Sequence, residues 1–298
     1  MMFFCILHLN RFSMNKVTAK ILNPPGYTLK IVAYVILGFS VIYLFYIFHH
    51  KSLRVDVMFL ATRFVNPLWA GAGIVLGGLN WVLRIKKWQF LASGLQKTSF
   101  KDAAFQQLST FSWSFFTPFN SGEFVQKPLF FDNKKAALKL VAYEQGSQMI
   151  ITLWLGITAL TIYFEFPVYI PVLLLITAAA VCIFLRKKFR NILLLSLLRY
   201  FVFGGFLLIL LILSSDRTPD IFLLGSQIAL YYAAVSFIPL IPGLDLPVKT
   251  SVAYLFFSGL FPAENSLLLI MLWLWIWNTF FPALAGQLWF YLRLRKIF

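Results

Sequence analysis

The sequence predicts an all-α protein that crosses a membrane several times, with about six transmembrane helices and two opposed re-entrant helical hairpins. Three observations predict this class. Sixty per cent of the 298 residues are hydrophobic. Only 12% are charged, against about 25% in soluble domains. Apolar stretches long enough to cross a bilayer recur along the chain. This composition excludes a soluble enzyme, a disordered chain and a disulfide scaffold.

The first 29 residues are predicted to form an N-terminal cytoplasmic segment, and residues 30–298 a single transmembrane domain. The apolar run Met1–Leu9 is shorter than the roughly 20 residues that cross a bilayer, and no small-residue cleavage site follows it. A conventional polar start begins at Met14. We interpret residues 1–13 as an upstream extension, with an interfacial N-terminal helix as the alternative.

Six apolar stretches are long enough to cross a bilayer, and each is bounded by charge, proline or glycine. They are residues 30–49, 65–83, 136–163, 166–185, 192–214 and 264–292. In the second stretch, Gly73 and Gly77 have the GxxxG spacing that suits close helix contact.

Two further apolar segments, 102–131 and 219–260, are interrupted by proline and glycine, which break helices. Both breaks share one pattern: a proline, a glycine four residues later, and then an acid followed four residues on by lysine. The residues are Pro118, Gly122, Glu123 and Lys127 at the first break, and Pro239, Gly243, Asp245 and Lys249 at the second. This internal repeat, with a long apolar helix on each side of each break, predicts the inverted-repeat plan of many transporters.

The distribution of basic residues predicts the topology. If each broken segment is a re-entrant hairpin, most of the 26 Lys and Arg residues, including all of those in 84–101, fall on one side of the membrane. Only Lys51, Arg54, Arg63 and Arg217 fall on the other side. Cytoplasmic loops carry the excess of Lys and Arg, so both termini are expected to be cytoplasmic. This bias also explains the net charge of +16 without nucleic-acid binding, for which no motif is present.

Ionisable residues inside the predicted membrane segments are the candidate functional residues. They are Glu123, Lys127, Glu144, Arg199, Asp245 and Lys249. Each would cost about 2.5–3.5 kcal/mol at the centre of a lipid-facing helix, so they must form ion pairs or line a wet cavity. One hypothesis makes them ion pairs that hold the bundle together. The other makes them a polar path for a charged headgroup or an ion, and half-helix N-termini at the breaks would favour phosphate there.

Polar residues accompany these charges, but no catalytic or metal-binding set does. Asn120 lies at the first break, and Asn278 lies within the last apolar stretch. No Ser-His-Asp set, paired carboxylates, phosphate loop or metal-ligand cluster is visible, and the chain has only two cysteines. We therefore expect no enzyme activity, no cofactor and no metal.

The same residues resemble a known group, the integral-membrane family that matches the flippase domain of lysylphosphatidylglycerol synthases. The resemblance covers about 65–292 and lies in five short stretches. These are Arg84–Trp88, Phe116–Glu123, Tyr143–Gln145, Pro239–Lys249 and Trp277–Gly286. It implies movement of lipids between the leaflets of a membrane. The aminoacyl-transfer domain of the full synthases has no counterpart here, so the resemblance implies translocation rather than lipid synthesis.

The sequence departs from the family pattern at three places. Gln145 stands where the family usually has arginine after the acid. Residues 120–123 replace a Gly-Gly-Asp type of turn. Asp245 and Lys249 occupy the positions of a Glu and an Arg in the family. This replacement keeps the signs of the charges but loses the bidentate phosphate contact of arginine.

The functional hypothesis is a flippase-like transporter of a phospholipid or another anionic lipid in a bacterial inner membrane. Lys127, Lys249 and Arg199 would hold the phosphate, and the three carboxylates would balance them or carry a coupling proton. The expected partners are membrane lipids and not nucleic acid, with a homo-oligomer or an envelope enzyme as further partners. Two alternatives stay open: a non-transporting subunit or scaffold of an envelope enzyme, and a small-molecule or ion transporter.

Overall fold

The computed structural model of the chain describes residues 67–117, 120–184, 187–215, 219–238, 240–260 and 265–294, together with residues 35 and 42. Within these residues every regular element is a helix and none is a strand, which confirms the predicted all-α class. The predicted N-terminal segment 1–29, its upstream extension 1–13 and nearly all of the predicted span 30–49 lie outside the described residues.

The first half of the described chain has two long helices with a broken segment between them. Its elements are α5 Pro67–Ala72, η1 Gly73–Gly77, α6 Gly78–Ala92, α7 Phe100–Ser114, α8 Ser121–Gln126, η3 Lys127–Phe130 and α9 Lys134–Tyr163. The π-helical turn η1 joins α5 and α6 into one continuous helix. The broken segment consists of α7, α8 and the 3₁₀ turn η3.

The second half repeats this order after the connecting helix α10, Tyr169–Phe184. Its elements are α11 Lys187–Ser214, α12 Ile221–Phe237, α13 Leu246–Phe257, η4 Ser258–Leu260, α14 Asn265–Trp275, η5 Ile276–Phe280 and α15 Phe281–Leu294. Here α11 is the first long helix, α12 and α13 form the broken segment, and a second π-helical turn, η5, joins α14 and α15.

Polar caps fix where three of these helices begin. The Ser99 hydroxyl accepts the backbone N–H of Asp102 at 3.1 Å at the start of α7. The Asn133 side chain accepts the N–H of Ala136 at 3.0 Å at the start of α9. Asp220 accepts the N–H groups of Phe222 and Leu223 before α12. Each cap satisfies a backbone donor that has no partner within the helix.

Four helices are long and apolar enough to cross a membrane, and they match four of the six predicted spans. They are Pro67–Ala92, Lys134–Tyr163, Lys187–Ser214 and Leu267–Arg293. The fourth predicted span, 166–185, forms the helix α10 of 16 residues, fewer than the roughly 20 that a crossing takes. The count of six therefore stays a prediction.

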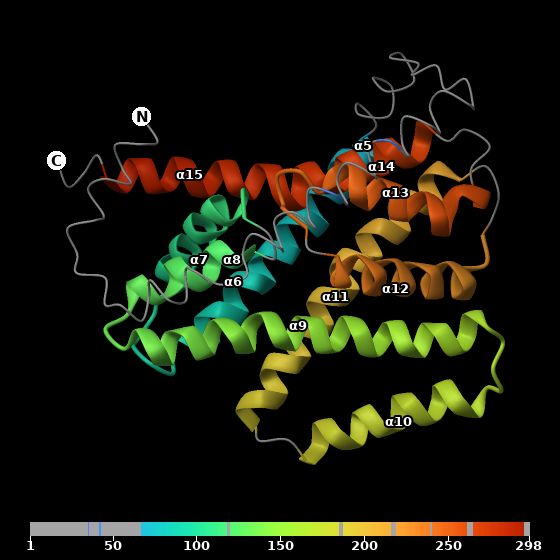
Figure 1. Ribbon diagram of the computed structural model, residues 1–298, viewed down its shortest axis with the longest axis horizontal. Helices are drawn as coiled ribbons and strands as arrows, with labels where there is room; N and C mark the ends of the chain where they lie inside the picture. Colours follow the sequence, from blue (N-terminus) through green and yellow to red (C-terminus); the bar gives the residue numbers. More distant parts are fainter. Residues whose placement is uncertain are drawn as a thin grey trace.

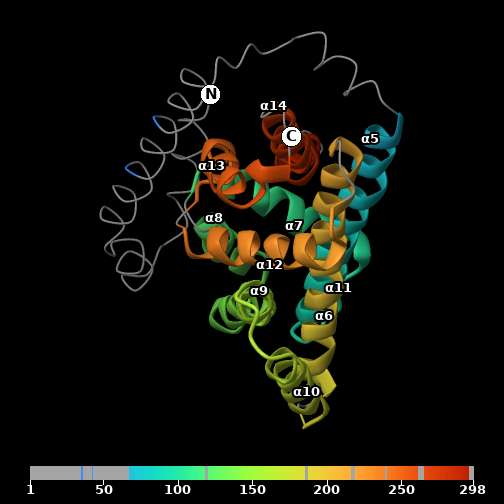
Figure 2. The same ribbon diagram turned by 90° about the vertical axis from the view of Figure 1, so that its right-hand side faces the viewer.

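The two halves pack on each other reciprocally. Helix α7 of the first half packs against α15 of the second, and α12 of the second packs against α9 of the first. Figure 1 shows α9 and α15 running in opposite directions, and Figure 2 shows α6 and α11 side by side, steeply inclined to α9 and α10. Glycine permits both reciprocal contacts, because a Cβ on Gly156 would overlap Ala233 of α12, and one on Gly286 would overlap the Leu108 carbonyl of α7.

The two helix breaks touch each other. The N–H of Gly243, in the second break, donates to the carbonyl of Phe115, in the first break, at 2.7 Å. A Cβ on Gly243 would lie 2.5 Å from the Phe115 ring, so the contact requires glycine. Figure 1 shows α7 and α8 toward the end of the molecule where α9 begins, and α12 and α13 toward the end where α9 ends. The broken segments therefore approach each other from opposite ends.

Basic residues gather at the end of the molecule where α9 begins, which we call the basic end. Contacts join the helix ends there: Arg293 of α15 bonds Asp102 of α7 at 3.3 Å, and Gln96 bonds the carbonyl of Phe130, just before α9. Lys188, at the start of α11, lies against Gly94, just after α6. Exposed Lys97, Lys101, Lys134, Lys135 and Lys187 lie on the same loops and helix ends. Four basic residues are predicted for the opposite side, namely Lys51, Arg54, Arg63 and Arg217. All four lie outside the described residues.

The reciprocal packing predicts the effect of adding one methyl group. We expect Gly156→Ala and Gly286→Ala each to lower the free energy of unfolding by about 1–3 kcal/mol, because overpacked contacts force the helices apart. Gly146→Ala is the matched control, since it lies in α9 with open space around its Cβ position. Thermal unfolding in detergent micelles measures the difference. If all three variants unfold together with wild type, the close helix approaches are wrong.

Candidate functional site

A cluster of six charged residues lies inside the helical bundle, and we call it the charge cluster. It comprises Arg84 and Lys87 from α6, Glu123 from α8, Lys127 from η3, Glu144 from α9 and Arg199 from α11. All but Arg199 are buried, with at most 6% of the residue exposed. The site thus depends on five elements, four of them in the first half of the described chain.

Lys127 lies at the centre of the cluster between two carboxylates. Its ammonium is 2.6 Å from an oxygen of Glu123 and 2.5 Å from an oxygen of Glu144. The pair with Glu123 spans four residues and bridges α8 and η3, as the spacing predicts. The ring of Trp88 lies 4.5 Å from the same ammonium, a cation–π contact. These partners leave Lys127 fully buried and fully paired.

Arg84 completes the first ion-pair network. Its guanidinium bonds the other oxygen of Glu123 and lies 4.8 Å and 5.0 Å from the ring centres of Trp81 and Phe111. Gln145 donates to Glu123 at 3.1 Å. Glu123 therefore receives bonds from three side chains, which offset the cost of burying its charge.

Lys87 is buried without a carboxylate partner among the described residues. Its ammonium donates to the backbone carbonyl of Glu144 at 2.7 Å and to the hydroxyls of Ser196 and Ser147 at 3.0 Å and 3.2 Å. Three neutral oxygens thus satisfy its three donors.

Arg199 is half-buried and also has only neutral partners among the described residues. It donates to Asn80 at 2.8 Å and to Gln148 at 3.4 Å. Asn80 in turn donates to Asn278 at 2.6 Å, which links the charge cluster to the π-helical turn η5. Among the described residues, only two of the five N–H donors of the guanidinium have an acceptor.

The second break holds a separate ion pair. Lys249 lies 2.5 Å from Asp245, with 30% of the Lys249 side chain exposed and 5% of the Asp245 side chain. Asn120 lies at the first break in the left-handed conformation, with φ of 53°, which asparagine tolerates better than most residues. Its side-chain oxygen is buried and accepts no hydrogen bond from the described residues.

The structure brings together some predicted site residues and leaves others apart. Glu123, Lys127 and Glu144 form one network, and Asn278 connects to Arg199 through Asn80. Asp245 and Lys249 pair with each other as their spacing predicts, but no described ion pair joins them to the charge cluster. Asn120 lies at the first break, next to the start of α8.

Sequence reasoning missed Arg84 and Lys87 because it ended the helix at residue 83 and assigned both residues to a surface loop. That assignment is wrong, since α6 continues to Ala92 and both side chains are buried. The missed signal was the spacing of Asn80, Arg84 and Lys87, which places three polar side chains on one helix face. Gln148, one turn after Glu144 in α9, also belongs to the site, because it accepts a hydrogen bond from Arg199.

The search for similar proteins finds no matching protein-family model, no similar curated protein and no similar solved structure.

The environment of Lys127 predicts a large loss of stability when this residue alone is removed. Lys127→Met leaves Glu123 and Glu144 as neighbouring carboxylates, and losing one member of a buried ion pair costs about 3–5 kcal/mol. Lys249→Met should cost less, because its side chain is 30% exposed. Thermal unfolding in detergent would rank the variants, with exposed Lys135→Met as the control.

A rescue variant separates charge from shape in the same experiment. Glu144→Gln added to Lys127→Met removes one of the two facing carboxylates, so part of the lost stability should return. A double variant less stable than Lys127→Met would show that the charges do not interact as described.

Proposed function

We propose that the chain is a flippase-like transporter that moves a phospholipid or another anionic lipid between the leaflets of a bacterial inner membrane. One observation carries the proposal, namely an excess of positive charge inside the bundle. Among the described residues, the four cations of the cluster, Lys87, Lys127, Arg84 and Arg199, share it with two carboxylates, Glu123 and Glu144. Even when the Lys87 amine is counted as neutral, three cations face two anions.

Uncompensated charge inside a membrane protein is costly, so it points to a ligand of the opposite sign. The surplus falls on Arg199, whose partners are uncharged amides. The side-chain nitrogen of the neighbouring Gln148 is buried and has no acceptor among the described residues. Donors without acceptors beside a half-buried guanidinium suit a phosphate, because phosphate only accepts hydrogen bonds at its charged oxygens.

These contacts alter the expected roles of the basic residues. Lys127 is occupied by Glu123 and Glu144, so we assign it to holding α8, η3 and α9 together. Arg199 is the primary phosphate ligand in the proposal, and the partly exposed Lys249 is a second one. The three carboxylates, Glu123, Glu144 and Asp245, stay the candidates for a coupling proton. No catalytic role is proposed for any of these residues.

The arrangement of the breaks supports transport rather than simple anchoring. In the proposed topology, α7–α8 and α12–α13 are re-entrant hairpins that come from opposite sides and meet where Gly243 contacts Phe115. Six spans, one of them at 30–49, then place both termini in the cytoplasm with the basic end. Broken helices that meet near the middle of the membrane are where transporters bind substrates.

A second candidate function is a non-transporting subunit or scaffold of an envelope enzyme. The saturation of Lys127 favours it, because a fully paired buried network is what a structural role requires. The two functions differ at Arg199, which a scaffold does not need to keep charged.

The proposal predicts that Arg199→Gln impairs transport while sparing the fold. The glutamine retains a donor for Asn80 but loses the charge-assisted bond to phosphate, which is worth about 1.5–3 kcal/mol. Flipping of an anionic lipid should therefore fall about 10- to 100-fold. A fluorescent lipid whose outer-leaflet label is reduced by dithionite measures the rate in proteoliposomes. The control is Lys187→Gln, an exposed change on the same helix.

Two outcomes would contradict the proposal. One is a wild-type protein that flips no anionic lipid above the rate of empty vesicles, which would favour the scaffold. The other is Arg199→Gln flipping as fast as wild type, which would remove Arg199 from the lipid path.

The topology predicts labelling from opposite sides. With Cys5 and Cys182 replaced by serine, Lys188→Cys should react with a membrane-impermeant thiol reagent only from the cytoplasm. Asp220→Cys, before α12, should react only from outside. Both positions are exposed in the structure, so reactivity reports sidedness. Reaction of both cysteines from one side would contradict the inverted arrangement.

A further inference from the structure

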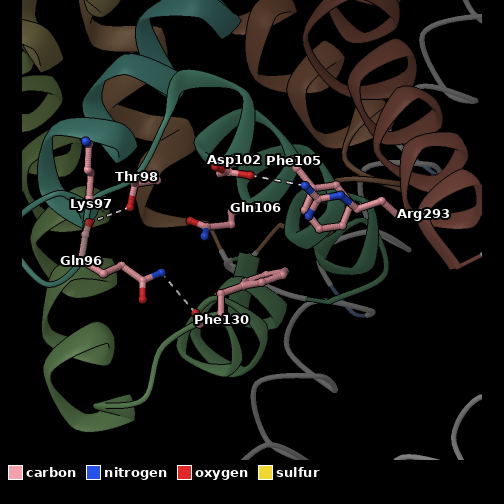
Figure 3. Close-up of a pocket in the computed structure, with 8 residues that line it drawn as sticks. All are labelled: Gln96, Lys97, Thr98, Asp102, Phe105, Gln106, Phe130 and Arg293. Atoms are coloured by element: carbon pink, nitrogen blue, oxygen red, sulfur yellow. Dashed lines mark hydrogen bonds and ion pairs between the residues drawn. The ribbon is translucent and has the colours of Figure 1, made fainter. Parts of the chain in front are cut away.

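A cavity of about 200 Å³ lies at the basic end, away from the charge cluster. Its walls come from the loop after α6, the first turns of α7, the turn η3 and the end of α15. The lining residues are Gln96, Lys97, Thr98, Asp102, Phe105, Gln106, Phe130 and Arg293 (Figure 3). The basic end brings these four chain segments together through the contacts of Arg293 and Gln96.

The charges around the cavity favour an anion. Two cations, Lys97 and Arg293, face one acid, Asp102. Asp102 is already engaged, because it accepts from the Ser99 hydroxyl at 2.6 Å and from Arg293 at 3.3 Å. The Ser99 bond, and next to it Arg293, lowers the pKa of the Asp102 carboxyl, which therefore stays ionised and keeps Arg293 in place. The Lys97 ammonium makes no ion pair or hydrogen bond with the described residues.

Two aromatic side chains, Phe105 and Phe130, add an apolar part to a cavity whose lining is otherwise polar. The Arg293 guanidinium lies 4.1 Å from the ring centre of Phe105, and the rings of Phe105 and Phe130 pack edge to face at 5.9 Å. A lipid offers this combination, because a charged phosphate is joined to an apolar glycerol ester region. The ends of α6 and α15, where the cavity lies, are the ends of two helices long enough to span a membrane. Lipid headgroups lie at that depth.

A chain of contacts runs from the cavity to the charge cluster. Gln106 lies in the middle of Figure 3, between Phe130 and Asp102. Its side-chain oxygen, Oε1, accepts the indole N–H of Trp88 at 2.8 Å. The ring of Trp88 contacts the ammonium of Lys127, the centre of the charge cluster, at 4.5 Å. A ligand that displaces Gln106 would therefore disturb Trp88, and with it the cation–π contact between Trp88 and Lys127.

We propose that this cavity is the loading site for an anionic phospholipid on the basic side of the membrane, with Lys97 and Arg293 binding its phosphate. The role in loading rests on the proposed function, whereas the binding of an anionic headgroup does not. The same phosphate chemistry could come from a soluble ion, and the position of the cavity at the ends of two helices long enough to span a membrane favours the lipid.

Binding is measured in neutral detergent by the shift of the unfolding temperature with ligand concentration. All variants are made in a background with Arg199→Gln and Lys249→Gln, which removes both proposed phosphate-binding residues of the buried site, so that the cavity is tested alone. The probes are short-chain phosphatidylglycerol, short-chain phosphatidylcholine and inorganic phosphate. Lys97→Gln and Arg293→Gln should each weaken phosphatidylglycerol binding about tenfold, the effect of one charge-assisted bond. Lys101→Gln, an exposed lysine of α7 that does not line the cavity, should leave binding unchanged.

The outcomes test the cavity independently of the proposed transport function. Equal binding in Lys97→Gln, Arg293→Gln and Lys101→Gln overturns the cavity proposal, even if Arg199→Gln abolishes flipping. Inorganic phosphate that binds as tightly as phosphatidylglycerol overturns the lipid as ligand. Equal shifts for phosphatidylcholine and phosphatidylglycerol overturn recognition of net negative charge. Weaker binding in both cavity variants supports the site, even in a protein that flips no lipid. If Arg293→Gln does not fold, the exposed Lys97→Gln decides the result.

Discussion

Charge buried in an apolar bundle needs partners within it, and the ion pairs of Lys127 supply them for the two carboxylates of the charge cluster. Its contacts with Glu123 and Glu144 join the short helix after the first break to the long helix α9. Arg84 extends the same network to α6. A short helix such as α8, with six residues, has little stability of its own. Its position therefore depends on these ion pairs rather than on its backbone hydrogen bonds.

Among the described residues, the second half has one ion pair of its own and a larger apolar core. Asp245 and Lys249 form one pair near the surface, while Phe206, Leu210, Phe257 and other fully buried residues fill the space among α11, α12, α13 and α14. The two halves share their element order and their reciprocal helix contacts, but they differ in how they are held together. Most of the charge cluster thus belongs to the first half, whereas Arg199, its proposed anion ligand, comes from α11 of the second half.

The sequence allowed prediction of features that depend on local spacing. The acid-to-lysine pairs at both breaks, the GxxxG contact and the long apolar helices all follow from periodicity. Gly73 and Gly77 indeed lie against Trp277, as close helix contact requires. Features that depend on distant partners could not be predicted. The bond between Asn80 and Arg199 joins residues 119 apart in the sequence, and only the crossing of α6 and α11 brings them together. Arg84 and Lys87 were not predicted as site residues, because basic residues at a helix end usually mark a membrane surface.

The uncompensated charge and the irregular backbone occur at the same place. Two π-helical turns, η1 and η5, contact each other where Trp277 fills the space over Gly73 and Gly77. Asn278 of η5 binds both Asn80 and Trp81 of α6, and Asn80 is the main partner of Arg199. π-Helical turns are rare and are frequently found at functional sites, because the extra residue is tolerated only where something requires it. Here η1 contacts α11, the helix that carries Arg199, and η5 reaches Arg199 through Asn278 and Asn80. Among the described residues, Arg199 is the one arginine of the charge cluster without a carboxylate partner. A structural role for the cluster accounts for the ion pairs of Lys127 but not for this surplus charge, which the proposed anionic ligand would neutralise.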